Sequence, residues 1–157
     1  MKLLSGFHME RDATGKAFLA SKLVVDLEKG YRGYHVFSSL KEGAFATLVD
    51  DELTVSESFQ WDECSPSFYF RGKRIGTPCS DAESFASLIH DVTRRVYRLV
   101  CVPFSRKDTD DFFYDALKLK GSKVKHTYHF AVSSFFGTMF IWFTTGKMDC
   151  YCKSCNK

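Results

Sequence analysis

The segment from Ser80 to Leu99 constrains the fold more than any other part of the chain. Ser80 and Glu83 have the spacing of a capping box, in which each side chain accepts a hydrogen bond from a free backbone N–H at a helix start. Apolar residues then recur at steps of three and four: Phe85, Leu88, Ile89, Val92, Val96 and Leu99. This spacing predicts an amphipathic helix over about 80–100, which has to pack against another element.

A second helix is predicted over about 108–120. Asp108, Asp110 and Asp111 stand at its start and Lys118 and Lys120 near its end, and these charges complement the helix dipole. Gly121 follows directly and provides a C-terminal stop.

The remaining regular structure is predicted to be β. Short apolar and β-branched runs are separated by turn residues, and they cover 17–27, 34–37, 44–49, 53–59 and 67–70. The aromatic run 123–145 predicts a C-terminal hairpin. For this single domain of 157 residues, the pattern predicts an α+β fold. An antiparallel sheet, made of a β-meander and the C-terminal hairpin, is packed by two helices. Residues 1–16 and 146–157 are expected to be loosely ordered ends.

Residues 130–145 contain no charged side chain. A helix that spans a bilayer needs about 20 apolar residues, and this run is shorter and includes Ser133, Ser134 and Thr138. A buried hairpin is therefore favoured over a membrane anchor, and no membrane partner is expected. The N-terminal apolar run, Leu3-Leu4, is also too short for a secretory signal, so we expect a cytoplasmic protein.

The six cysteines are expected to be reduced thiols in that compartment. Cys150, Cys152 and Cys155 form a Cys-x-Cys-x-x-Cys motif, and thiolates at close spacing bind Zn²⁺. Zinc requires a fourth ligand, for which the candidates are Cys64, Cys79, His126 and His129. The alternative is a flexible tail that carries three thiols.

Charge is distributed unevenly. Seven acidic residues and no Lys or Arg lie between Glu42 and Glu63, whereas residues 117–157 contain seven lysines and one acid. Such asymmetry is typical of proteins with a polyanionic partner, and nucleic acid is the first candidate. Ten cations form the predicted nucleic-acid-binding set: Arg71, Lys73, Arg74, Arg94, Arg95, Arg98, Lys118, Lys120, Lys123 and Lys125. The alternative is that helix-end cations serve the dipole and strand lysines keep edges soluble.

The sequence contains neither a Walker-type phosphate loop nor a nucleophile elbow, so we expect a binding protein rather than an enzyme. Nucleic-acid binding is the leading hypothesis, and it requires the cations to converge on one surface. A second hypothesis is a protein-binding regulator or inhibitor, of the kind that viruses direct at host machinery, which would use the acidic region 42–63. A third is a small zinc-stabilised interaction module.

Overall fold

The computed structural model describes residues 1–61, 68–70, 73–75, 79–99, 101–123, 125–133 and 150–152. These residues form antiparallel sheets and helices, so the predicted α+β class is confirmed. The strands before the helices are β1 Lys2–Leu3, β2 Met9–Arg11, β3 Ala17–Leu19, β4 Leu23–Asp26, β5 Tyr34–Ser39, β6 Gly43–Val49, β7 Glu52–Val55, β8 Gln60–Trp61, β9 Phe68–Phe70 and β10 Lys73–Ile75. Helices α1 Asp81–Val96, α2 Arg106–Leu119 and α3 Lys125–Ser133 follow, and then strand β11 Cys150–Cys152.

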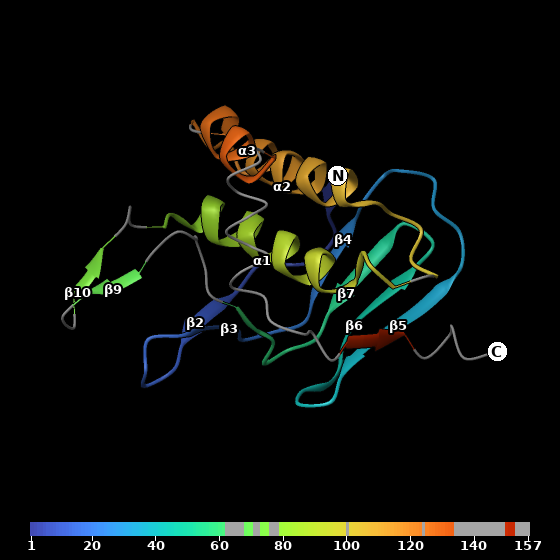
Figure 1. The fold of residues 1–157 in the computed structure, drawn as a ribbon, viewed down its shortest axis with the longest axis horizontal. Helices are drawn as coiled ribbons and strands as arrows, with labels where there is room; N and C mark the ends of the chain where they lie inside the picture. The colour runs from blue at the N-terminus through green and yellow to red at the C-terminus, as the bar shows by residue number, and fades with distance from the viewer. Residues whose placement is uncertain are drawn as a thin grey trace.

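The main sheet has the strand order β1-β4-β7-β6-β5-β11, and every neighbouring pair is antiparallel. Its centre is the meander β5-β6-β7, as the sequence predicts. The short strand β11 pairs with the edge of β5, so the end of the chain returns to the sheet that its N-terminal third builds (Figure 1). A smaller sheet has the order β2-β3-β8, and β9 and β10 form a hairpin.

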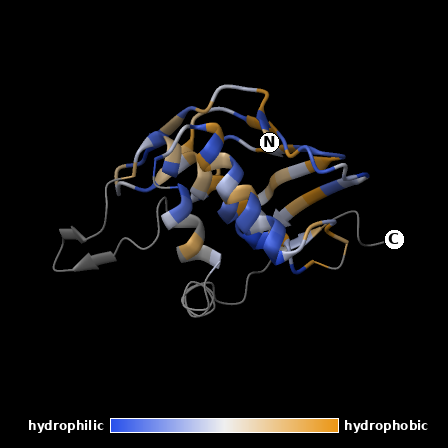
Figure 2. Cartoon of the chain, turned by 90° about the horizontal axis from the view of Figure 1, so that it is seen from above, coloured by the Kyte–Doolittle hydropathy of each residue, from blue (hydrophilic) through white to orange (hydrophobic). Residues whose placement is uncertain are grey.

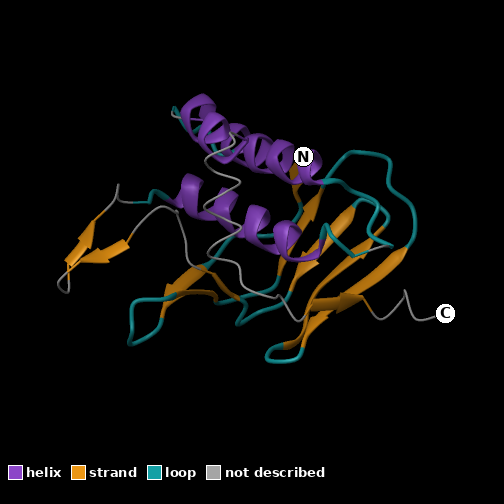
Figure 3. Ribbon diagram, in the orientation of Figure 1, coloured by secondary structure: helices purple, strands orange, loops and turns teal. Residues whose placement is uncertain are grey.

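Helices α1 and α2 lie side by side and run in opposite directions, with α1 nearer to the strands (Figures 1 and 3). The predicted capping box at Ser80 is confirmed, because Glu83 Oε2 accepts from the Ser80 backbone N–H at 2.9 Å. Helix α2 begins two residues earlier than predicted. Its capping box is formed by Ser105 and Asp108. Gly121 adopts a positive φ of 71°, which accounts for the helix stop.

The core lies between the helices and the sheets. The apolar stripe of α1 is buried as predicted, with Phe85, Val92 and Val96 fully inaccessible. They form one cluster with sheet residues that include Phe37 and Leu53. The strands and helices carry hydrophobic residues beside hydrophilic ones, in keeping with burial of one side only (Figure 2).

The prediction of a hairpin over 123–145 is wrong in its first part, because residues 125–133 form helix α3. The aromatic and β-branched residues there favour strands only weakly, and a contact between helices outweighs this preference. The ring of His126 in α3 lies 5.4 Å from that of Tyr114 in α2. Residues 134–145 of the predicted hairpin lie outside the described residues.

Three further segments differ from the sequence-based expectation. The predicted strand 17–27 is divided into β3 and β4, which belong to different sheets. Both ends that were expected to be loosely ordered contribute paired strands, namely β1 and β2 at the start and β11 near the end.

Within the described part of the chain, no helix has the length and apolar character needed to cross a bilayer.

Candidate functional site

Three metal-ligating side chains from distant parts of the chain meet at the edge of the main sheet. They are His35 in β5, Cys101 in the connection between α1 and α2, and Cys152 in β11. Their ligand atoms all lie within 4.8 Å of one another. Cys152 is buried, and the other two residues are partly buried. The chemistry of this donor set, two sulfurs and one imidazole nitrogen, suits a metal ion such as Zn²⁺.

Strand pairing brings Cys152 to His35. Cys152 is opposite Phe37 in the β11–β5 register, and His35 lies two residues before Phe37 on the same strand. Residues two apart on a strand point to the same face. The ring of His35 lies parallel to that of Phe37, with the two planes 8° apart and the ring centres 6.2 Å apart. Cys152 Sγ and His35 Nδ1 are consequently 3.9 Å apart.

Gly33 makes room for the His35 ring. Its φ is +120°, a conformation that favours glycine, and a Cβ atom at this position would be 3.2 Å from His35 Nε2. A side chain at residue 33 would therefore be strained and would press against the imidazole.

The protonation state of His35 suits metal binding. Burial lowers the pKa of the imidazole, so the ring is neutral at physiological pH and its lone pair is available. Tetrahedral zinc with bonds of about 2.3 Å to sulfur and about 2.1 Å to nitrogen would place these two atoms roughly 3.6 Å apart. The observed 3.9 Å therefore requires a movement of only a few tenths of an ångström.

The oxidation state of Cys101 decides whether the three residues can act together. Cys101 and Cys79 are each part of a disulfide in the structure, so the expectation of reduced thiols is not met at these two cysteines. Cys152 keeps its thiol. Because a metal ligand must be a thiolate, Cys101 can contribute only after its disulfide is reduced.

The predicted metal motif is only partly represented in this cluster. Cys152 belongs to it, the side chain of Cys150 lies outside the described residues, and so does Cys155. Among the proposed fourth ligands, Cys79 is disulfide-bonded and His126 is exposed on α3, while Cys64 and the side chain of His129 are not described. His35 and Cys101 were not predicted, because no local spacing relates residues that the strand order brings together.

Arg94, predicted to bind nucleic acid, instead belongs to a buried ionic network between α1 and α2. Arg94 is 7% exposed, and its Nη2 donates to Asp110 Oδ1 at 2.6 Å. His90 Nε2 lies 3.2 Å from the same oxygen and 3.1 Å from Arg94 Nε. Burial, the largest influence, lowers the pKa of His90 despite the neighbouring carboxylate. Burial also opposes ionisation of Asp110, but the contacts from His90 and Arg94 outweigh it and lower the pKa of Asp110.

The predicted arginines Arg95 and Arg98 do not form a common surface with the buried Arg94. Arg95 Nη1 is 2.7 Å from Glu42 Oε2, and its guanidinium lies 4.7 Å from the centre of the Phe59 ring. Arg98 follows the last turn of α1 and is exposed, with its Nε donating to the Tyr97 hydroxyl at 2.8 Å. Arg71 lies outside the described residues. Lys73 and Arg74 are in β10, where only the backbone is described.

The four predicted lysines cluster around the turn between α2 and α3. Lys118 and Lys123 are exposed, and Lys125 is partly buried at the start of α3. Lys120 Nζ is 5.0 Å from the centre of the Phe85 ring, near the start of α1. Arg98 is at the other end of this 16-residue helix, which is about 24 Å long. The lysines and Arg98 therefore do not converge.

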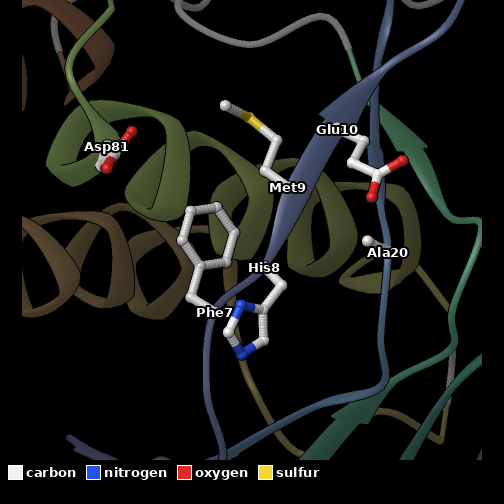
Figure 4. A pocket seen from close by; sticks show the side chains of 6 residues that line it. All are labelled: Phe7, His8, Met9, Glu10, Ala20 and Asp81. Atoms are coloured by element: carbon white, nitrogen blue, oxygen red, sulfur yellow. The ribbon is translucent and has the colours of Figure 1, made fainter.

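A surface pocket beside the smaller sheet has a different character. Its volume is about 310 Å³, and it is lined by Phe7, His8, Met9, Glu10, Ala20 and Asp81 (Figure 4). Glu10 comes from β2 and Asp81 is the first residue of α1. With two carboxylates and no lysine or arginine in its lining, this pocket is unsuited to a phosphate.

Comparison with known proteins identifies no relative. No family model, no curated protein and no solved structure matches this chain.

Proposed function

We propose that this chain is a non-catalytic interaction module stabilised by zinc. The observation that carries the proposal is the meeting of His35, Cys101 and Cys152 within 4.8 Å. The fourth ligand would be water or a further thiol, with Cys150 and Cys155 as the sequence candidates.

A structural role for the metal is supported by the position of its ligands. Strand β11 has three residues and forms the edge of the main sheet, so few hydrogen bonds hold it. Bound zinc would join this strand to β5 and to the connection between the two long helices. Cys152 is 3% exposed, which favours a metal enclosed by protein over one that is open to substrate.

Zinc binding by Cys101 requires that its disulfide is first reduced. A dithiol reductant would cleave its disulfide by thiol–disulfide exchange, giving two cysteine thiols and the oxidised cyclic disulfide of the reductant. Zinc would then bind the thiolates of Cys101 and Cys152, with release of two protons, and the neutral imidazole of His35. The disulfide and the zinc complex use the same sulfur and exclude each other.

Zinc titration of the full chain, with and without a dithiol reductant that is removed before the measurement, tests the proposal. We expect about one zinc per reduced chain and far weaker binding to the oxidised chain. Zinc at 100 times its Kd should stabilise the reduced fold by about 2.7 kcal/mol, or raise its Tm by about 5–10 °C. Absence of zinc binding to the reduced, folded chain would overturn the proposal, whereas equal binding by both forms would exclude Cys101 as a ligand.

A further inference from the structure

We propose that the α2–α3 corner binds single-stranded nucleic acid. The surface consists of Tyr114 and Lys118 on α2, Lys123 in the turn, and His126 and Phe130 on α3, and we call it the aromatic–lysine surface. On this surface Lys118 and Lys123 contact phosphates, and the rings of His126 and Phe130 stack on unpaired bases. This inference goes beyond the zinc-stabilised module and does not depend on the metal.

The surface contains two aromatic rings that are exposed to solvent. Phe130 is 74% exposed, so most of the ring gains nothing from burial. His126 precedes it by four residues on the same helix, which places both side chains on one face. His126 is exposed, and its ring lies against Tyr114 at 5.4 Å. Two exposed rings on α3, one of them packed against the partly buried ring of Tyr114, are a suitable platform for bases, because every base has a π-face.

The α2–α3 corner also carries exposed positive charge. Lys118 and Lys123 are exposed, and neither has a carboxylate at ion-pair distance within the described part of the chain. No acidic residue occurs between Ala116 and Ser133 in the sequence. The nearest preceding acids are neutralised, since Asp115 lies 3.5 Å from Lys29 Nζ and Asp111 lies 2.7 Å from Lys107 Nζ. The carboxylate of Glu83 contacts the turn through Ser122, but four lysines, at positions 118, 120, 123 and 125, surround the same turn, so positive charge predominates there, as a phosphate backbone requires.

The turn that carries these side chains is held in place by the neighbouring helix. Ser122 Oγ donates to Glu83 Oε1 at 2.8 Å, so the same carboxylate caps α1 and anchors the turn. Lys120 Nζ lies over the rings of Phe7 and Phe85. A surface fixed before binding loses less conformational entropy when a ligand arrives, which favours affinity.

Single strands fit this surface better than duplex. Specific readout of a duplex needs side chains that enter a groove and reach base edges, and arginine is the commonest of them. Arg94 and Arg95 are engaged with Asp110 and Glu42, and Arg98 is at the opposite end of α1. The aromatic–lysine surface offers stacking and phosphate contacts, which are the two elements of binding to unpaired strands.

Fluorescence anisotropy with a labelled 12-nucleotide single strand tests the inference on the full chain. If two to three phosphates are contacted, affinity should fall about 7- to 20-fold between 50 and 200 mM salt. Phe130→Ala should weaken binding about 5-fold or more, through loss of stacking on one base. Lys118→Ala and Lys123→Ala should each reduce the slope of log affinity against log salt by about 0.7.

Leu40→Ala is the matched control, because Leu40 is 76% exposed and lies in the turn between β5 and β6. It should leave the affinity unchanged. Thermal unfolding of each variant confirms that the fold is intact, and Phe130 is exposed enough for its replacement to be tolerated. No binding at 50 mM salt would overturn the inference. So would equal affinity for a duplex of the same length, or an unchanged affinity of folded Phe130→Ala.

Discussion

The Sγ atom of Cys152 lies 3.9 Å from Nδ1 of His35, although 117 positions separate the two residues in the chain. The contact exists because β11 pairs with β5 in an antiparallel register. A metal ion held by these two side chains would join β11 to β5 and so stabilise β11. Cys101 would add a third ligand once its disulfide is reduced.

The first prediction concerns the ligands of the proposed zinc site. His35→Gln and Cys152→Ser should each weaken zinc binding to the reduced chain by at least 10-fold, because each removes one donor atom. His126→Gln is the control, since His126 lies on α3 outside the cluster. Competition with a chromophoric chelator gives the affinities. Equal affinities for Cys152→Ser and wild type would remove Cys152 from the site.

The second prediction concerns the space that Gly33 provides. Gly33→Ala should destabilise the fold by about 1–2 kcal/mol through its positive φ. It should also weaken zinc binding, because the new Cβ presses on the His35 ring. Gly15→Ala has a comparable backbone cost at φ +83° but meets no atom within 4 Å. Urea unfolding and zinc titration of both variants separate the two effects. Weaker zinc binding in Gly33→Ala alone is the expected result, and an equal loss in both variants would contradict it.

The third prediction concerns the buried ionic network. Arg94→Ala removes the shortest ion-pair contact of the buried Asp110 carboxylate and should lower the free energy of unfolding by about 3–5 kcal/mol. Arg98→Ala, just beyond the end of α1 and exposed, should change the free energy of unfolding by less than about 0.5 kcal/mol. Chemical denaturation of the two variants makes the comparison. If both variants lower the free energy of unfolding by an equally small amount, the ionic network contributes little to stability.

The fourth prediction concerns acid stability. Burial lowers the pKa of His90 in the folded chain below its unfolded value of about 6.5, so the unfolded chain binds more protons between the two values. Stability is therefore complete above about pH 6.5 and falls as the pH drops toward the folded pKa. Asp110, whose pKa is also lowered, adds a further loss of stability below about pH 4.

Denaturant unfolding at pH 7.5, 6.5, 5.5 and 5.0 measures this dependence in the zinc-free chain. The slope contributed by His90 cannot exceed about 1.4 kcal/mol per pH unit. His90→Gln should flatten the profile between pH 6.5 and 5.5, where His35, whose pKa burial also lowers, still contributes. A steep slope that persists in His90→Gln would assign the acid sensitivity to another group.

Local signals in the sequence predicted much of the fold. The Ser80–Glu83 capping box, the apolar stripe of α1 and the Gly121 stop depend on residues within a few positions of one another, so their physics can be evaluated in one segment. The meander β5-β6-β7 follows from apolar runs separated by turn residues. The segment 125–133 was misassigned because weak strand preference does not decide against a contact between helices.

Patterns along the chain were enough to assign the α+β class and the two long helices, and they located the lysines around Gly121. Which side chains meet, in contrast, depends on how the helices and strands pack. This packing brought Cys152 to His35 and Cys101, placed Arg94 beside Asp110, and put Arg98 and Lys120 at opposite ends of α1. Helix and turn formation depends on neighbours along the chain, whereas strand pairing and helix packing join residues of any separation. The position of a charge or a thiol in the sequence therefore does not reveal its partner in space.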